Sequence, residues 1–141
     1  IRDYFPMAGI GLDIIIGFPT ETEEDFFETK EFLTALSIDY MHIFRYSDRD
    51  GTQSYSLKPK VAEEVKEKRI EKLKEIDRNK REKFYERFLN KEVKCLFDRK
   101  QNGVNRFITR EYLKVYSKKI VNENEFTAKL TSLNPPIIES I

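Results

Sequence analysis

The spacing of apolar and polar positions changes twice along the chain, and the changes divide it into three blocks. In the first block, a short apolar run from Leu12 to Ile16 is followed by apolar positions at helical spacing and then by a second apolar run, 39–46. Two strand-like runs joined by a helix within about 30 residues are typical of a β–α–β unit, whose strands are parallel. Because the first run is continuous, it predicts a strand covered on both faces.

The helix between these runs has a recognisable start and a recognisable face. Thr20 followed by Glu23 has the spacing of a capping box, and the acidic residues of 21–25 suit the positive end of a helix. The residues expected to face the sheet are Phe26, Thr29, Phe32, Leu33 and Leu36. One β–α–β unit cannot close a sheet, so we expect 1–58 to be the last part of a larger α/β fold.

The second and third blocks differ from the first. Residues 59–90 predict one long connecting helix, because they are mostly charged with a narrow apolar stripe. The third block, 91–133, holds four short alternating or β-branched segments: 92–98, 104–109, 112–117 and 126–131. Such closely spaced strands predict a small antiparallel β-barrel of four or five strands, with a hairpin at Asn102-Gly103. We expect the tail, 134–141, to be irregular because of its two prolines.

Charge is distributed unevenly along these blocks. The first, 1–58, carries five Lys and Arg against eleven Asp and Glu, whereas 91–141 carries ten against six, although the net charge of the whole chain is only +1. A basic block is typical of a surface that binds nucleic acid, and it is equally compatible with a solvated surface. The two ends of the chain are therefore expected to face different partners.

Composition excludes several classes of protein. No apolar run reaches the length of about 18 residues that a transmembrane helix needs. The only cysteine, Cys95, excludes an internal disulfide framework and a multi-cysteine metal site within these residues, and we expect a reducing, cytoplasmic location. The chain begins at Ile1 rather than at a methionine, which indicates a piece of a longer polypeptide.

A short motif follows the first predicted strand. Gly17 would let the backbone approach a ligand closely, and Pro19 would fix the turn, at the strand end where ligands bind in parallel α/β folds. The alternative is that Gly17-Phe18-Pro19 only makes a tight turn.

Other single residues also leave two interpretations open. His42 fits a structural histidine better than a cofactor contact, and Cys95, which alternates with Val93 and Phe97, fits a small core residue. Phe84, Tyr85 and Phe88 are expected to form a packing cluster. Tyr112 and Tyr116 lie among basic residues, where they would either stack on RNA bases or pack within a hairpin.

Two stretches carry a resemblance to a known family. "DIIIGFPTETEEDF" and "MHIFRYSDRDGT", followed by a helix ending in "KREKFYERFLNKEV", resemble the radical SAM methylthiotransferases that modify tRNA. The resemblance spans about 2–132. It implies the end of a radical SAM partial barrel, a connecting helix and a small RNA-binding barrel called a TRAM domain. The segment "HIFRYSDRDGT" most resembles the branch that acts on N6-threonylcarbamoyladenosine at position 37 of tRNA.

The resemblance also implies roles for individual residues. Those expected near the SAM cofactor are Asp13, Ile15, Gly17, Phe44 and Tyr46. Those expected to face the cofactors or the target nucleotide are Arg45, Ser47, Arg49 and Thr52. Those expected to contact RNA phosphates are Lys94, Arg99, Arg106, Arg110 and Lys114. No residue is identified as a catalytic acid, base or nucleophile, and none as a metal ligand.

The departures from the family pattern define what this chain can do alone. The three-cysteine motif that holds a [4Fe–4S] cluster is absent, Thr20 stands where most relatives have Gly, and no Gly precedes the last predicted strand. The parent enzyme would use SAM and [4Fe–4S] clusters to methylthiolate C2 of the adenosine. We expect this chain to bind neither cofactor and to be inactive by itself.

Three other interpretations stay open. The chain could belong to the sister branch that acts on isopentenyladenosine, be a stand-alone RNA-binding module, or be a partner-binding protein whose long helix is the working surface. We expect no membrane partner. The exposed edge of the predicted sheet would have to pair with another copy or pack on the helix.

Overall fold

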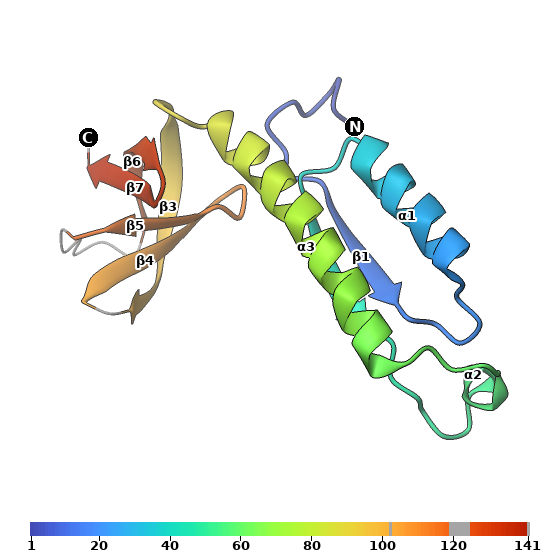
Figure 1. Ribbon diagram of the computed structural model, residues 1–141. Helices are drawn as coiled ribbons and strands as arrows, with labels where there is room; N and C mark the ends of the chain where they lie inside the picture. Colours follow the sequence, from blue (N-terminus) through green and yellow to red (C-terminus); the bar gives the residue numbers. More distant parts are fainter. Residues whose placement is uncertain (102, 119–124, 141) are drawn as a thin grey trace. The chain divides into compact units, whose positions relative to one another are not determined.

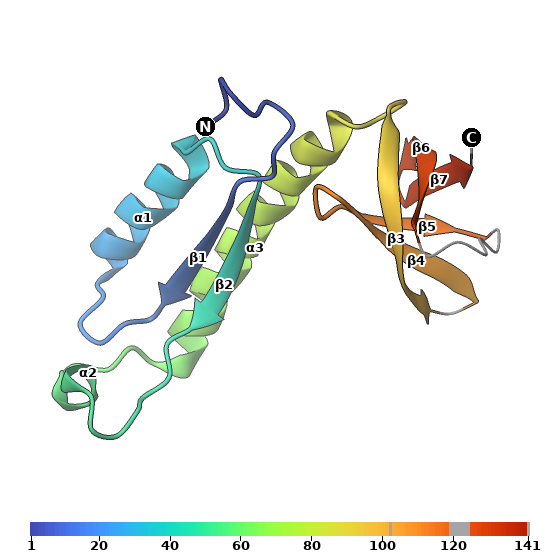
Figure 2. The same cartoon turned by 180° about the vertical axis from the view of Figure 1, so that it is seen from behind.

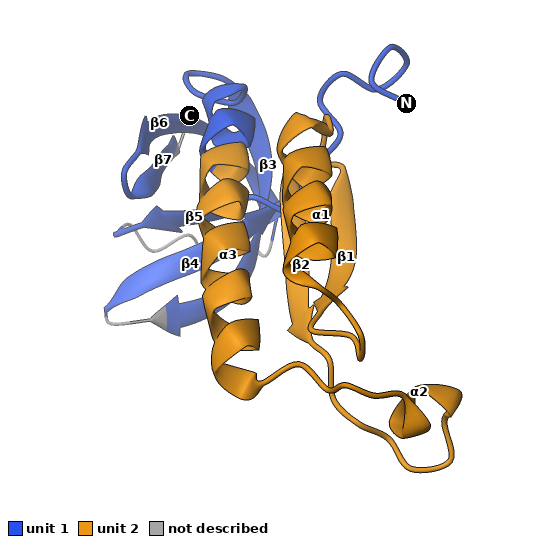
Figure 3. Ribbon diagram, turned by 45° about the vertical axis from the view of Figure 1, so that its right-hand side comes forward, with its two compact units in different colours: residues 1–9, 82–141 blue, residues 10–81 orange. Residues whose placement is uncertain are grey.

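A computed structural model describes residues 1–101, 103–118 and 125–140. The elements are β1 (Gly11–Ile16), α1 (Glu23–Ala35), β2 (Tyr40–Arg45), α2 (Gln53–Ser56), α3 (Glu63–Glu86), β3 (Glu92–Gln101), β4 (Val104–Thr109), β5 (Lys114–Ser117), β6 (Glu125–Leu133) and β7 (Pro136–Ser140) (Figure 1). They form two compact units, 10–81 and 1–9 with 82–141, which are coloured separately in Figure 3. No helix among the described residues combines the length and the apolar character needed to cross a membrane.

The unit 10–81 contains the predicted β–α–β arrangement. β1 and β2 pair in parallel, with Gly11 opposite Tyr40 and Ile16 opposite Arg45. In Figure 2 the two strands lie in front of α3. The core of the unit comes from β1, β2, α1 and α3, and its buried residues are Ile16, Phe26, Leu33, Met41, Ile70 and Leu73.

The prediction that the first strand is covered on both faces was wrong for these residues. Leu12, Ile14 and Ile16 of β1 face the core, whereas the alternate residue Ile15 is 58% exposed. Side chains of a strand alternate between the two faces of a sheet, so α1 and α3 cover only one face. The other face is open, and the predicted site lies there.

The start and the face of α1 also differ from the prediction. The capping box is formed by Thr22 and Asp25, two residues later than predicted: the Asp25 backbone N–H donates to Thr22 Oγ1 (3.1 Å), and the Thr22 backbone N–H donates to Asp25 Oδ2 (2.8 Å). Phe26 and Leu33 are buried as predicted, but Phe32 is 62% exposed. Adjacent residues of a helix are rotated by about 100° around its axis, so Phe32 points to solvent although its neighbour Leu33 faces the core.

The unit that contains 82–141 is a closed barrel with the strand order β3-β4-β5-β7-β6. The predicted strands are confirmed within a few residues at each end. The predicted hairpin joins β3 and β4, which pair antiparallel, although its Asn102 lies outside the described residues. Gly103 has φ +78° there, a conformation that glycine adopts readily.

Two predictions about the barrel were wrong. The tail is not irregular, because 136–140 form β7, which pairs antiparallel with β6 and in parallel with β5. The barrel is therefore mixed rather than antiparallel. Pro135 precedes β7 and Pro136 stands at its first position, where a proline is tolerated, so the two prolines do not prevent the strand.

The barrel core includes the end of the long helix. Phe84 and Phe88 are buried among the barrel residues, and Tyr85 packs against the same cluster, which confirms the predicted packing cluster. Cys95 and Val93 are buried there as predicted, whereas Phe97 is 44% exposed. The register between β3 and β4 shifts between Phe97 and Arg99, so the alternation of faces is irregular where β3 leaves the core.

Candidate functional site

An open hollow of about 610 Å³ lies on the uncovered face of the β1–β2 pair, toward the carboxyl ends of the strands. Its lining consists of Asp13, Ile15, Phe44, Arg45, Tyr46, Ser47, Arg49, Thr52 and Ser54. Sequence reasoning named all of these residues except Ser54 as cofactor or substrate contacts. The structure brings them together at the place where parallel α/β folds bind ligands, while their roles stay predictions.

The hollow combines an apolar surface with polar loop residues. Ile15 and Phe44 are register partners on the two strands, and their side chains are 58% and 51% exposed. The Arg45 guanidinium lies 3.1 Å from both the Glu63 and the Glu67 carboxylates, so its charge is already balanced. A ligand with a flat apolar part and polar substituents, such as a nucleoside, matches this surface.

Gly17 does not line the hollow. Its φ is +81°, and a Cβ at this position would lie 2.4 Å from Cγ of Lys66. The space that sequence reasoning reserved for a ligand is thus filled by the stem of a lysine from α3. Glycine is required here by its backbone conformation and by this close side chain.

Lys66 itself is a buried cation, only 6% exposed. Its ammonium donates to Glu63 Oε1 (2.7 Å) and to the Tyr46 carbonyl (3.4 Å), and it lies 5.7 Å from the centroid of the Tyr46 ring. Tyr46 lines the hollow, and its ring is also 5.3 Å from Phe18 of the turn after β1. Lys66 therefore holds one wall of the hollow from behind.

Arg69 is a second buried cation on the same face of α3, and it is 4% exposed. It forms ion pairs with Glu21, whose carboxylate also accepts the Gly17 backbone N–H (3.0 Å), and with Glu23 (3.0 Å). Its hydrogen bond to Glu23 lowers the pKa of that carboxyl. Arg69 thus fixes the turn between β1 and α1, since buried charges need partners of this kind.

Sequence reasoning missed both buried cations. It described the long helix as mostly charged with a narrow apolar stripe, and it gave none of the charged residues a buried position. The available signal was spacing: Lys66 lies four residues before Ile70, Arg69 lies four residues before Leu73, and all four residues are buried.

The predicted RNA-contacting residues of the barrel separate into two groups. Arg106 forms an ion pair with Asp98, and Arg99 lies 3.2 Å from the same carboxylate. The hydrogen bond from Arg106 is the main cause that lowers the pKa of Asp98. Lys94, Arg110 and Lys114 are exposed, and none of them forms an ion pair within the described part of the chain.

Lys94 and Arg110 lie beside each other. The Arg110 backbone N–H donates to the Lys94 carbonyl (3.1 Å). Both residues line a second hollow, of about 380 Å³, whose other lining residues are Cys95, Leu96, Ile108, Thr109, Tyr112 and Glu125. Exposed unpaired cations next to one another are the residue types that bind phosphate groups.

The structure also places His42 and Cys95, for which the sequence left two interpretations open. His42 is exposed on the open face of the sheet, where its ring lies 5.5 Å from that of Tyr40, so it is not a buried core histidine. Burial raises the pKa of the Cys95 thiol to about 12. Across the described ranges, no group of three or more His, Cys, Asp and Glu side chains is arranged to hold a metal ion.

Comparison with known proteins adds an independent observation. The chain is 48% identical over 110 residues to "Threonylcarbamoyladenosine tRNA methylthiotransferase MtaB" of Aquifex aeolicus, which covers 78% of this chain and 26% of the relative. It is 37% identical over 113 residues to "Ribosomal protein uS12 methylthiotransferase RimO" of Thermosipho melanesiensis, covering 80% of this chain and 26% of the relative. It is 40% identical over 98 residues to "tRNA-2-methylthio-N(6)-dimethylallyladenosine synthase" of Clostridium tetani, covering 70% of this chain and 23% of the relative.

No protein-family model matches the chain. The relatives share one kind of chemistry, the transfer of a methylthio group, on different substrates. Their similarity extends over most of this chain and supports its interpretation as a fragment of a radical SAM methylthiotransferase. The chain spans about a quarter of the length of the curated relatives it matches.

Proposed function

We propose that this chain is part of an enzyme that methylthiolates C2 of N6-threonylcarbamoyladenosine at position 37 of tRNA. The observation that carries the proposal is the 48% identity to the threonylcarbamoyladenosine tRNA methylthiotransferase, compared with 37% to 44% for the relatives named for other substrates. The resemblance of 42–52 to the same branch supports it. The chain's part would be to form one side of the cofactor site and to bind tRNA.

The hollow on the open sheet face fits the SAM cofactor that such enzymes use. Ile15 and Phe44 expose apolar surface suited to an adenine ring, and Ser47 and Thr52 supply hydroxyl groups for the polar parts. When bound, one SAM would supply the methyl group, and a second, reduced by a cluster, would supply the radical that activates C2. This chain's residues would orient the cofactor, and Lys66 would keep Tyr46 in place behind it.

The described residues do not fit the iron–sulfur clusters. A cluster ligand must be a thiolate, and the buried Cys95 thiol has its pKa raised to about 12. In the proposal, the clusters are held by residues outside this chain. The chain alone is therefore expected to have no methylthiotransferase activity.

The barrel would be the part that binds tRNA. Lys94, Arg110 and Lys114 are exposed and carry charges that no carboxylate balances in the part of the chain that the structure describes. Such cations release counterions when they meet phosphates, which is the main source of affinity for nucleic acid. This observation favours tRNA over a ribosomal protein as the substrate.

The product of the complete enzyme tests the proposal. The full-length polypeptide containing this chain is reconstituted with iron and sulfide without oxygen and incubated with SAM, a reductant and one of three substrates. These are tRNA carrying N6-threonylcarbamoyladenosine, tRNA carrying isopentenyladenosine, and ribosomal protein uS12. We expect mass spectrometry of the digests to find the methylthio group on the threonylcarbamoyl nucleoside. Its appearance only in either other substrate would contradict the proposal.

A further inference from the structure

One turn of the barrel holds an aromatic residue in a conformation that such residues avoid. In the turn between β4 and β5, Thr109 is buried, and its hydroxyl accepts the backbone N–H groups of Glu111 (3.3 Å) and Leu113 (3.2 Å). The Tyr112 N–H donates to the Thr109 carbonyl (2.9 Å). Leu113 is completely buried in the barrel core. The turn is thus fixed at both ends, and the backbone of Tyr112 has no freedom to relax.

The resulting conformation disfavours a tyrosine. Tyr112 has φ +66°, in the left-handed region where glycine and asparagine are common and bulky residues are outliers. Its side chain is 78% exposed and makes no hydrogen bond with the described residues. The ring therefore contributes little to packing, although its presence strains the backbone. Residues of this kind are concentrated at functional sites.

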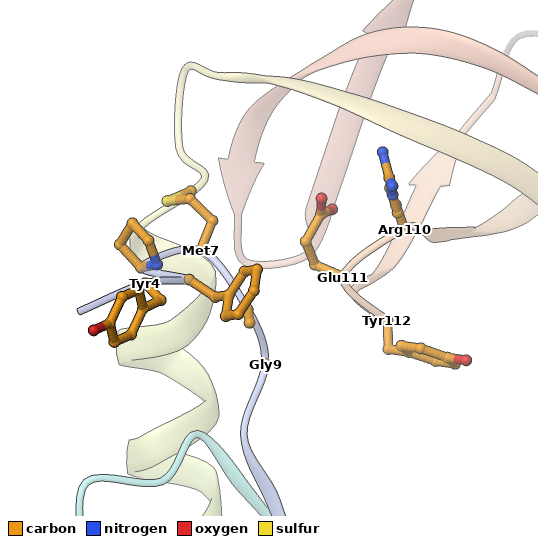
Figure 4. A pocket seen from close by; sticks show the side chains of 9 residues that line it. Tyr4, Met7, Gly9, Arg110, Glu111 and Tyr112 are labelled. Atoms are coloured by element: carbon orange, nitrogen blue, oxygen red, sulfur yellow. The ribbon is translucent and has the colours of Figure 1, made fainter. Parts of the chain in front are cut away.

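The surroundings of Tyr112 indicate the kind of ligand. Tyr112 and Arg110 line two hollows of the barrel unit: the one of about 380 Å³ that Lys94 also lines, and a larger one of about 500 Å³. The other lining residues of the larger hollow are Tyr4, Phe5, Pro6, Met7, Ala8, Gly9 and Glu111 (Figure 4). In Figure 4 the Tyr112 ring projects away from the Arg110 and Glu111 side chains, which agrees with its high exposure to solvent.

Charge around the ring favours an anionic polymer with flat apolar groups. Lys94 and Arg110 form no ion pair among the residues that the structure describes, and the hollow they share has a single carboxylate, that of Glu125. An exposed aromatic ring flanked by free cations is the arrangement with which proteins bind single-stranded nucleic acid.

We propose that Tyr112 is a stacking platform for an unpaired base of the RNA, with Arg110 and Lys94 bound to the neighbouring phosphates. The proposal rests on the proposed function in one respect, that the partner is RNA. It goes further by assigning the unpaired base to one residue and one turn. Tyr112 would be a binding residue and would take no part in the chemical step.

Substitution of Tyr112 separates binding from folding. Tyr112→Asn removes the ring and places a residue that tolerates φ +66°, so the melting temperature should stay the same or rise. Affinity for a fluorescein-labelled RNA of about ten nucleotides should fall between about 5-fold and 100-fold, the range for losing one stacked base. Tyr112→Phe keeps the ring and should bind as tightly as the parent chain. A lower melting temperature for Tyr112→Asn with unchanged RNA affinity would overturn the proposal.

A strand without bases provides the matched control. The same experiment is repeated with an oligomer of equal length and charge that carries abasic sugars. The parent chain and Tyr112→Asn should bind this oligomer equally, because only the base contacts the ring. Arg110→Gln should weaken both oligomers and reduce the dependence of log affinity on log salt by about one. If Tyr112→Asn lost as much affinity for the abasic oligomer as for the RNA, Tyr112 would not act by stacking on a base.

These outcomes are distinct from those of the substrate assay. Stacking of a base on Tyr112 with methylthiolation of another substrate would leave this inference intact and contradict the proposed function. Methylthiolation of the threonylcarbamoyl nucleoside together with unchanged RNA binding by Tyr112→Asn would support the proposed function and contradict this inference.

Discussion

Two turns, one in each compact unit, each combine a residue at positive φ with a nearby arginine, but the two arginines have opposite environments. The turn after β1 holds Thr20 at φ +73°, and the turn between β4 and β5 holds Tyr112 at φ +66°. Each turn has an arginine beside it. Arg69 is buried and paired with two glutamates, whereas Arg110 is exposed and has no ion pair among the described residues. The first turn is a structural support for the hollow, and the second presents charge and a ring to a ligand.

The comparison shows that burial, rather than the number of charges, decides what a cation does. Counting Lys and Arg gives the acidic first block and the basic last block, but it does not tell Lys66 from Lys94. Lys66 and Arg69 are desolvated and stabilise the fold only because their partners remain in place. An exposed cation gains little from an ion pair and is free to bind a phosphate.

The largest expected effect is the loss of a buried cation. Arg69→Met leaves Glu21 without its partner, and the free energy of unfolding should fall by about 3–5 kcal/mol. The measurement is urea denaturation of the chain. Lys72→Met is the matched control on the same helix, because Lys72 is exposed and 3.7 Å from Glu23, and it should change stability by less than about 1 kcal/mol. Equal effects of the two substitutions would contradict the structural role of Arg69.

A second prediction concerns Gly17, which lies against the aliphatic part of the Lys66 side chain. Gly17→Ala adds a Cβ in a left-handed conformation and against Lys66, so we expect a loss of about 3 kcal/mol in the free energy of unfolding. In the Lys66→Ala background the steric part disappears, and the same change should cost only about 1–2 kcal/mol. A cost that is equal in both backgrounds would show that the lysine stem does not limit this position.

A third, smaller effect should have the opposite sign. Thr20→Gly removes the strain of a β-branched residue at φ +73°, and it keeps the backbone N–H that donates to the Pro59 carbonyl (2.9 Å). We expect a gain of about 1 kcal/mol in the free energy of unfolding. Thermal unfolding should show a higher melting temperature, and a decrease would indicate that the threonine side chain contributes to the turn.

The smallest effect concerns the reactivity of Cys95. Burial, and then the negative charge of Glu111, raises the pKa of the thiol to about 12, so the reactive thiolate is absent until the pH approaches that value. The folded chain should resist iodoacetamide at pH 8, and the urea-unfolded chain should react completely. Modification of the folded chain at the rate of an exposed cysteine would contradict the assigned burial.

Much of the fold follows from patterns that the sequence displays directly. The parallel strands, the long helix and the hairpin each depend on local spacing, and the hollow could be predicted because parallel strands place their carboxyl ends together. β7 was missed because Pro135-Pro136 signals a break, although one strand edge of the barrel remained to be paired. The open face of β1 was missed because Ile14, Ile15 and Ile16 look alike in sequence, and only the positions of α1 and α3 distinguish them.

The residues that line the hollow could be predicted, but the buried cations that hold them in place could not. Residues of both strands and of the following loop were named from the resemblance to the methylthiotransferases. The roles of Lys66 and Arg69 depend instead on contacts with residues 20 and 48 positions away in the sequence. The division of the barrel cations also depends on a pairing, that of Arg106 with Asp98, which no local spacing requires.

The central claim is that the exposed, unpaired cations of the barrel bind RNA and the paired ones do not. The measurement is tRNA binding by the chain over a series of salt concentrations, for the triple variant of Lys94, Arg110 and Lys114 to Gln and for Arg106→Gln. We expect the triple variant to bind weakly and to reduce the slope of log affinity against log salt by about two to three, while Arg106→Gln keeps the parent slope. Unchanged affinity and slope in the triple variant would contradict the account.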